Sequence, residues 1–381
     1  MNKKVMVVAI AAALAAPTTA LAQISLKGRF VVEFAPAADQ MDQPGAGGPD
    51  GPGRETADGF NSPASWIRFA AEEKLGGGYS IWAQCETRAR WGNDTNPSQG
   101  TSGICDRNSA LGIKGSFGNF FVGRWDTAME DSSGLTRITG STGWDGRQHM
   151  LTEDQSGFIS FAGRYQNSLN YNSPTWSGFS VNLSTTSTGA QLNTSAAAGS
   201  QGLDGRVYSI VGKYAAGPLV AYIGYEKHDD NQAVASGGLA GTEEDMVTFG
   251  ASYVFGPVKV GFVYTTFEGD VDASSTIERD SWQIAGEWSV TPAGKVRVAY
   301  TEAGEYEGSG LASAGLASGD TGAKQYGIGY YHTLSKQTIV GVYYTKVDND
   351  TNGVYNYHGF NDAVKPGDSA SAFALHAAHN F

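Results

Sequence analysis

The stretch RNSALGIKGSFGNFFVGRW, residues 107–125, decides the fold of this chain. We interpret it as two antiparallel strands joined by a two-residue turn at Gly118 and Asn119, a common connection in hairpins. A third strand, GRYQNSLNYNS at residues 163–173, follows only after a long polar segment. The chain is therefore expected to be built from consecutive antiparallel strands.

The polar segment, residues 126–157, is too long for an ordinary hairpin loop and shows no clean apolar periodicity. Connections of this length in a compact fold are usually functional. Acids lie within the segment, and arginines lie on the strands around it: Glu130, Asp131, Asp145, Glu153 and Asp154 against Arg107, Arg124 and Arg164. This is the charge arrangement of a pore constriction.

The first 22 residues have the organisation of an export signal. Two lysines at residues 3–4 precede an apolar core at residues 5–16, and residues 20–22 form a small-residue cleavage site. No later stretch approaches the roughly 20 apolar residues that a membrane helix requires. We therefore expect an exported protein whose mature chain, residues 23–381, forms one domain.

Strands throughout the mature chain alternate with a period of two. In the first, residues 24–34, the apolar side chains share one face, and Lys27, Arg29 and Glu33 lie on the other. A polar face repeated around the chain suits a water-filled interior, and alternation also explains why hydrophobic residues reach only 40%. The same pattern recurs at residues 247–255, 258–265, 282–290 and 296–301.

The connections alternate between seven short turns and eight long loops, which together join sixteen strands. The long loops include residues 35–63 and 268–279. The last strand ends in Phe381, which we expect to close the barrel against the first strand and leave no open edge in lipid. The predicted fold is all-β: a 16-stranded antiparallel transmembrane β-barrel.

The formal net charge of −12 argues against nucleic acid as a partner, because nucleic-acid binding calls for basic patches. The acid runs are solvated loop surface, a cation-attracting vestibule, or sites where divalent cations bridge to lipopolysaccharide. They fall mainly in the expected loops, at residues 229–230, 243–245, 268–272, 302–307 and 348–350.

Cys85 and Cys105 are the only cysteines, and an oxidising export route permits a disulfide between them. Such a bond would close a loop of about 20 residues and contribute on the order of 3 kcal/mol. Strand parity, however, places Cys85 on the lipid-facing side, which is awkward for pairing with Cys105.

Several stretches taken together resemble the general, trimeric porins of Gram-negative bacteria, particularly those of β-proteobacteria. The resemblance implies an outer-membrane homotrimer and a passive channel for ions and small hydrophilic solutes. We expect no cofactor and no metal. It also implies a third external loop folded into the lumen. The stretches are ISLKGRF (24–30), SWIRFAAEEKLGGGYSIWAQCETR (65–88), RNSALGIKGSFGNFFVGR (107–124), RYQNSLNYNSPTWSGFSVNL (164–183), YYHTLSKQTIVGVYYTKVDN (330–349) and HNF (379–381).

By position, the resemblance implies a basic wall facing acids on the third loop. The basic residues are Arg29, Arg68, Arg107, Arg124 and Arg164; further lumen residues are Lys27, Glu86 and Arg88. The Pro-Glu-Phe motif of related loops is absent, and we expect Asp131, Asp145 and Glu153 to face the arginines. Arg107 shares strand parity with the apolar Leu111 and Ile113, which the alternation does not explain.

Other functions remain open at this point. A substrate-specific channel would look almost identical in sequence. A barrel-embedded enzyme would need a nucleophile and a base on neighbouring strands, and the six histidines form no recognisable catalytic set. A structural anchor has little support, because we expect no periplasmic or passenger domain in the mature chain. The arginine wall favours anions and the acidic loops favour cations, and we favour anions.

Overall fold

The computed structural model describes residues 23–40, 57–62, 64–89, 103–133, 144, 146–152, 161–187, 205–229, 242–356 and 365–381. The predicted export signal at residues 1–22 lies outside this set. None of the helices in the described ranges combines the length and apolar character needed to cross a membrane.

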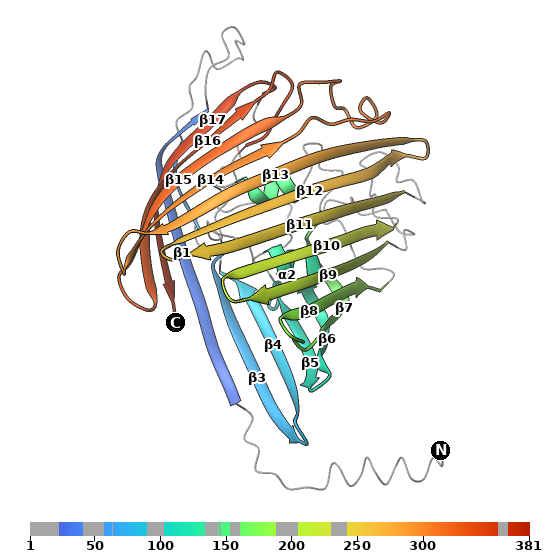
Figure 1. Ribbon diagram of the computed structural model, residues 1–381, viewed down its shortest axis with the longest axis vertical. Coiled ribbons are helices and arrows are strands. Elements are labelled where there is room, and N and C mark those ends of the chain that lie inside the picture. The colour runs from blue at the N-terminus through green and yellow to red at the C-terminus, as the bar shows by residue number, and fades with distance from the viewer. Residues whose placement is uncertain are drawn as a thin grey trace.

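The described residues form a closed antiparallel barrel of sixteen strands (Figure 1). Each strand pairs with its neighbours along the chain, and β1 pairs with both β3 and β17, which closes the ring. The prediction of a 16-stranded barrel is confirmed. The barrel strands are β1 (Gln23–Gln40), β3 (Trp66–Gly76), β4 (Tyr79–Arg88), β5 (Ser109–Gly115), β6 (Gly118–Asp126), β7 (Arg164–Asn172), β8 (Phe179–Thr186), β9 (Arg206–Ala216), β10 (Leu219–Asp229), β11 (Glu243–Phe255), β12 (Val258–Asp272), β13 (Ser275–Ser289), β14 (Gly294–Ala303), β15 (Ala323–Thr333), β16 (Thr338–Asn349) and β17 (Ser369–Asn380).

The described parts of the connections contain the shorter elements β2 (Ala57–Asn61), α2 (Ala128–Ser133) and the π-helical turn η3 (Arg147–Thr152). The expected long loop at residues 35–63 is therefore wrong in part. Strand β1 continues to Gln40, and β2 pairs with it, with Phe34 opposite Phe60. The two rings lie 4.8 Å apart, and this contact holds the added strand against the barrel.

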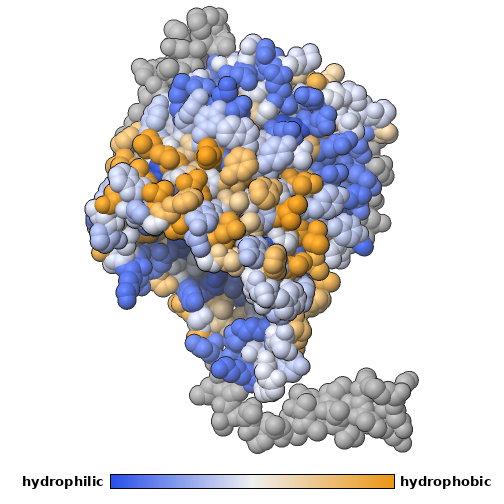
Figure 2. Space-filling model, viewed as in Figure 1, coloured by the Kyte–Doolittle hydropathy of each residue, from blue (hydrophilic) through white to orange (hydrophobic). Residues whose placement is uncertain are grey.

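The two faces of the wall differ as the alternation predicts. Ile223 on β10 and Ile328 on β15 are 60% and 52% exposed, whereas the neighbouring polar side chains Thr248, Gln325 and Thr345 are buried on the other face. Hydrophobic residues gather in a band across the visible wall, and hydrophilic residues lie on both sides of this band (Figure 2). The exposed face is suited to lipid, and the opposite face is polar.

The C-terminal residue seals the barrel. The backbone of Phe381 exchanges two hydrogen bonds of 3.0 Å with Gly28 of β1, and its ring stacks on Phe30 at 5.8 Å. A Cβ atom at Gly28 would lie 2.2 Å from the Phe381 ring, so only glycine leaves space for it. The terminal aromatic therefore packs across the seam between β1 and β17.

Two predicted connections are wrong. Gly115 pairs with Gly118, so Ser116 and Phe117 form the turn between β5 and β6, and Asn119 is a strand residue that accepts a hydrogen bond from Trp82. The expected loop at residues 268–279 is instead the end of a long hairpin, because β12 runs to Asp272 and β13 begins at Ser275.

A disulfide joins Cys85 and Cys105, whose Cα atoms are 4.7 Å apart. Cys105 precedes β5 and adopts a positive φ of 65°. Its backbone N–H donates to Thr87 Oγ1 at 2.9 Å, and Thr87 has the same strand parity as Cys85. The chain thus folds back over this face of β4, which removes the difficulty that strand parity raised.

Candidate functional site

Glu86 on β4 is the centre of a charged cluster on the polar face of the wall. Its side chain is 2% exposed. Arg68 of β3 donates from Nε to one carboxylate oxygen at 2.8 Å and also contacts it through Nη2, and Arg107 donates from Nε to the other oxygen at 2.6 Å. Two arginines thus share one carboxylate, which leaves positive charge in excess.

Arg107 reaches this face because it precedes the regular part of β5. Its backbone N–H donates to the Glu86 carbonyl at 3.0 Å, and the chain bends at residues 107–108 before the strand begins at Ser109. Leu111 and Ile113 lie on the exposed face as the alternation requires. The bend accounts for the parity that the sequence left unexplained.

Arg164 and Asp126 form a second pair, on β7 and β6. Arg164 Nη2 lies 2.7 Å from Asp126 Oδ1, and Arg164 Nε donates to Asn108 Oδ1 at 2.6 Å. Asn108 in turn donates to Asp126 at 2.8 Å, which completes a triangle of contacts. Nearby, Arg124 donates to the carbonyl of Asp106 at 2.9 Å.

Strand register aligns the remaining lumen candidates in two rows. In one row Lys27 lies opposite Arg68, which lies opposite Glu86. In the next row Arg29 and Arg88 lie on either side of Trp66, whose ring is 4.5 Å from the Arg68 guanidinium. We call this cluster the basic wall: Lys27, Arg29, Arg68, Arg88, Arg107, Arg124 and Arg164, with the acids Glu33, Glu86, Asp106 and Asp126.

The connection between β6 and β7, here called the central segment (residues 127–163), contacts the polar face of the wall on the other strands. At the start of α2, Ala128 N donates to Ser184 Oγ of β8 at 2.9 Å, and Met129 N donates to Ser209 Oγ of β9 at 3.0 Å. Hydroxyl groups of the wall thus satisfy N–H groups that the first turn of a helix leaves free.

The middle of the central segment is held by β14, β15 and β16. The Trp144 carbonyl accepts from Thr345 Oγ1 at 2.8 Å, and its indole stacks on Tyr343 at 5.7 Å. A Cβ atom at Gly327 would lie 2.2 Å from the indole, so this glycine makes room for the ring. Trp144 is consequently buried.

The last part of the central segment returns along β13, β12 and β10. In η3, the Leu151 carbonyl accepts from Thr265 Oγ1 at 3.0 Å. Ala162 N then donates to Glu226 Oε1 at 2.8 Å. Glu226 Oε1 also lies 3.1 Å from Nε2 of the fully buried His228. The carboxylate of Glu226 therefore links the end of the central segment to a buried histidine on β10.

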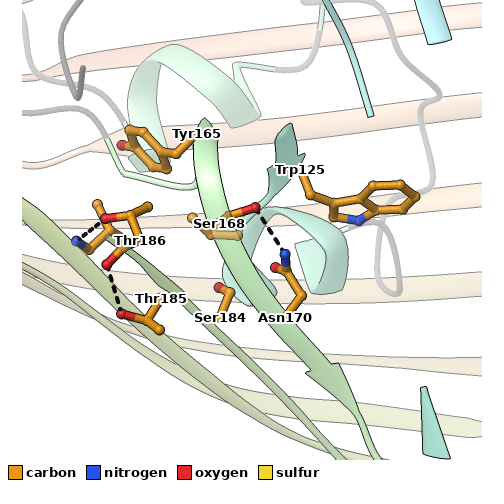
Figure 3. A pocket seen from close by; sticks show the side chains of 9 residues that line it. Trp125, Tyr165, Ser168, Asn170, Ser184, Thr185 and Thr186 are labelled. Carbon is orange, nitrogen blue, oxygen red and sulfur yellow. Dashed lines mark hydrogen bonds between the residues drawn. The ribbon is translucent and has the colours of Figure 1, made fainter. Parts of the chain in front are cut away.

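Little space separates the central segment from the wall. The cavity between Met129, Leu151 and Tyr222 has a volume of about 10 Å³, which is the lower limit for one water molecule. Figure 3 shows a second hollow, where the side chains of Ser168 and Asn170 are hydrogen-bonded at 2.9 Å. The described parts of the central segment are thus packed closely against the wall at these two places.

The three acids expected to face the arginines have different outcomes. Asp145 and Glu153 lie outside the described residues, so their role stays a prediction. Asp131 lies in α2, where its charged neighbours are Lys213 and Asp126. Partial desolvation by the surrounding protein raises the pKa of Asp131, although its side chain is still exposed to solvent, and the Lys213 charge opposes this shift. The described ion pairs of the wall arginines go instead to Glu86 and Asp126.

Sequence reasoning missed several polar partners. Asp126 ends β6 directly after Trp125, so its place at a strand end beside Arg164 could have been found from the pairing. Glu33 accepts from Tyr343 Oη at 3.1 Å across the seam, and no local pattern indicates that contact. Among the described residues, no group of three His, Cys, Asp or Glu side chains is arranged to hold a metal ion.

Comparison with known proteins agrees with this geometry. The family model described as Gram-negative porin matches residues 9–352. The chain belongs to the Gram-negative porin family. This porin is therefore a channel protein of the outer membrane and not an enzyme.

Individual relatives are similar at lower identity. Outer membrane porin protein 32 of Delftia acidovorans is 26% identical over 282 residues, covering 71% of this chain and 70% of the relative. The solved anion-selective porin from Comamonas acidovorans has a TM-score of 0.71 at 20% identity, covering 95% of this chain and all of that one. The trimer form of OmpT, an outer membrane protein of Vibrio cholerae, has a TM-score of 0.65 at 15% identity, covering 94% of this chain and 99% of that one.

Proposed function

We propose that this porin is a passive, water-filled channel for ions and small hydrophilic solutes, narrowed by the central segment. In this proposal the central segment is the third external loop and folds into the lumen opposite the basic wall. The observation that carries the proposal is the division of the polar face. Apart from α2 beside β6, the described parts of the central segment contact β8–β10 and β12–β16, whereas the arginines of the basic wall lie on β1 and β3–β7.

The proposed mechanism requires no binding step. Positive charge on one side of a narrow section and acids on the other set up a transverse field that orients water and dipolar solutes. Hydrophobic solutes would have to disturb this ordered water, while small polar ones pass. The basic residues of the wall outnumber its carboxylates, so we infer a preference for anions; the likeness to the Comamonas anion-selective porin supports this inference.

We also propose a homotrimer and a contact with lipopolysaccharide. The trimer form of OmpT supports the first. For the second, Glu268, Glu278 and Asp280 lie on the outward face of β12 and β13, beyond the aromatic residues Tyr264 and Trp282. Carboxylates at this level are placed to bridge to lipid phosphates through divalent cations. Residues 1–22 would direct export before they are removed.

Planar-bilayer conductance under a salt gradient tests the proposed function. We expect steps in groups of three that scale with bulk conductivity, and a reversal potential indicating anions. Arg68→Ala, Arg107→Ala and Arg164→Ala should each shift the reversal potential toward cations. Arg206→Ala is the matched control, because Arg206 lies on the outward face over Tyr208. Correctly folded protein without conductance would contradict the proposal.

A further inference from the structure

Arg279 is a buried arginine on the polar face of β13, distant in sequence from the basic wall. It is 2% exposed. Its Nη1 donates to Tyr306 Oη at 2.6 Å and to Tyr355 Oη, and its Nη2 donates to the Met150 carbonyl at 2.9 Å. These three acceptors are uncharged. One guanidinium can donate to all three because it carries five N–H donors that point in different directions within one plane.

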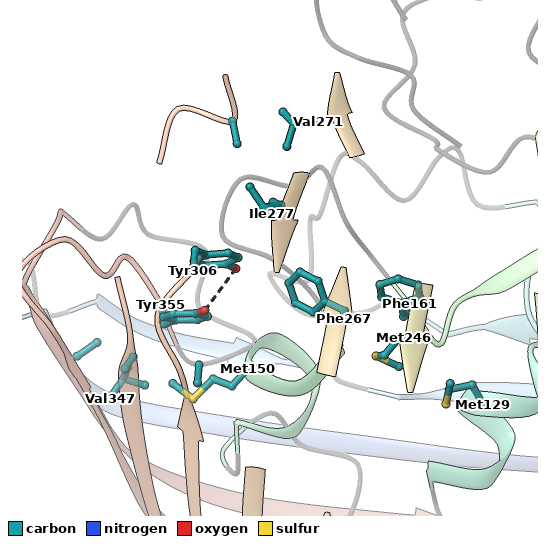
Figure 4. Close-up of a cluster of buried hydrophobic side chains, with 14 of the residues drawn as sticks. Met129, Met150, Phe161, Met246, Phe267, Val271, Ile277, Tyr306, Val347 and Tyr355 are labelled. Atoms are coloured by element: carbon teal, nitrogen blue, oxygen red, sulfur yellow. Dashed lines mark hydrogen bonds between the residues drawn. The ribbon is translucent and has the colours of Figure 1, made fainter. Parts of the chain in front are cut away.

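Aromatic rings surround the same guanidinium. Its carbon lies 4.8 Å from the ring centre of Phe267, 5.0 Å from that of Tyr306 and 5.6 Å from that of Tyr355. The negative faces of aromatic rings stabilise a cation, most strongly where water is excluded. In Figure 4 the side chains of Tyr306 and Tyr355 lie side by side, joined by a hydrogen bond of 3.4 Å, with Met150 and Phe267 close by.

The three acceptors come from three separate connections. Met150 belongs to η3 in the central segment, Tyr306 to the connection between β14 and β15, and Tyr355 to the connection between β16 and β17. Arg279 itself follows the short turn between β12 and β13. One side chain thus joins the central segment to the wall and to two external connections.

We propose that Arg279 is a positioning residue that clamps the central segment in its conducting position and couples it to the two external connections. The inference rests on the proposed function, since it assumes that the central segment narrows the pore. Without the guanidinium, the Met150 carbonyl and both tyrosine hydroxyl groups lose their shared donor. The central segment then exchanges more readily between wall-bound and displaced positions, which in a pore appears as closure.

Voltage-induced closure and open-channel noise test the clamp. In single-channel recordings, Arg279→Met should close at lower voltage and spend about tenfold more time closed at a given voltage, because a charge-assisted hydrogen bond shifts an equilibrium by roughly that factor. Arg279→Lys keeps the positive charge but replaces the planar guanidinium with a single ammonium group. It should therefore increase the time spent closed by less than Arg279→Met does. Tyr355→Phe removes one acceptor and should give a smaller effect in the same direction.

Coupling separates a clamp from a general loss of packing. Arg279→Met combined with Tyr355→Phe should be no worse than Arg279→Met alone, because the hydroxyl has already lost its donor. Arg206→Met is the control and should close like the unmodified protein. Heat-resistant oligomers on gels establish folding, and if Arg279→Met does not fold, Arg279→Lys and Tyr355→Phe carry the test.

Two outcomes overturn the inference and differ from failure of the proposed function. If folded Arg279 variants close and fluctuate like the unmodified channel, Arg279 is not a clamp, although the pore stands. If the effects of Arg279→Met and Tyr355→Phe simply add, the two groups act independently and the clamp is also wrong. Absence of conductance in the unmodified protein would instead remove the proposed function itself.

Discussion

Glu86 illustrates how a single carboxylate sets the balance of the basic wall. Arg68 and Arg107 both donate to it, and its side chain is almost inaccessible to water. Glu86→Gln keeps the size of the side chain but removes the charge and turns an amide donor toward two guanidinium groups. We expect a loss of stability of about 1–3 kcal/mol, because two partly buried guanidinium groups lose their charged partner.

The same substitution should shift the reversal potential toward anions, because the wall loses a negative charge. Thermal unfolding and bilayer recordings of Glu86→Gln measure the two effects. Glu278→Gln is the control, since this carboxylate is exposed on the outward face. A selectivity unchanged by Glu86→Gln would show that the ions pass elsewhere.

Asp131 predicts a pH dependence of selectivity. Partial desolvation by the protein around it raises its pKa, so it takes up a proton at a higher pH than an ordinary aspartate. Protonation removes a negative charge beside Lys213, so the anion preference should begin to rise as the pH falls toward the raised pKa. Reversal potentials between about pH 7 and about pH 3 measure this change, and the range spans the ordinary carboxyl pKa values.

Asp131→Asn provides the comparison for this titration. At neutral pH, Asp131→Asn should already prefer anions more strongly than the unmodified protein. As the pH falls, its anion preference should not show the first increase that protonation of Asp131 causes in the unmodified protein. The reversal potentials of the two proteins should change equally with pH only at lower pH, where other carboxylates titrate. Identical titrations in both proteins would mean that Asp131 does not face the ion path.

Individual wall residues could be predicted from the sequence, but many of their partners could not. Arg68, Arg107 and Glu86 follow from recognisable strand stretches, and the structure brings them together. Arg279 shows no such signal, because its role depends on Met150, Tyr306 and Tyr355, which lie 27 to 129 positions away in the chain. Contacts between separate connections leave no periodic trace in the sequence.

At the scale of elements, the seam between β1 and β17 gives a prediction for Gly28. A methyl group at this position would overlap the Phe381 ring, which sits 2.2 Å from the ideal Cβ position. Gly28→Ala should therefore displace the terminal ring and reduce stability by about 1–3 kcal/mol, as overpacking does.

Thermal unfolding of purified barrels, with the yield of folded protein after refolding, measures the effect of Gly28→Ala. Gly286→Ala on β13 is the matched control, because its Cβ would meet Val298 at 3.4 Å, an ordinary contact. Equal losses in the two variants would mean that closure of the seam does not depend on the terminal ring.

Strands were easier to predict than their ends. Alternation identified β12 and β13, but the acids at residues 268–272 suggested a loop that does not exist. In the structure these strands continue, because Phe267, Val271 and Ile277 pack into a buried cluster on one face while Glu268 and Glu278 face outward. Charged side chains can lie on the water-exposed face of a continuing strand. A run of acidic residues alone therefore does not predict the end of a strand.

At the scale of the whole molecule, the charge pattern predicts a salt-dependent selectivity. In the proposed pore the basic wall acts on ions through an open lumen rather than through a closed pocket, so we expect mobile ions to screen it. The screening length falls from about 10 Å at 0.1 M salt to about 3 Å at 1 M. The anion preference should therefore weaken over this range toward the ratio of the ionic mobilities in bulk solution.

The triple variant Arg68→Ala, Arg107→Ala and Arg164→Ala provides the comparison. Its anion preference should change far less over the same range of salt, because most of the charge that is screened has been removed. Reversal potentials at a fixed salt ratio and rising total salt make the comparison. An anion preference that persists at about 1 M salt, where screening is nearly complete beyond contact distance, points to ions held in direct contact with the wall. That result would replace passive diffusion with a channel that binds its solute.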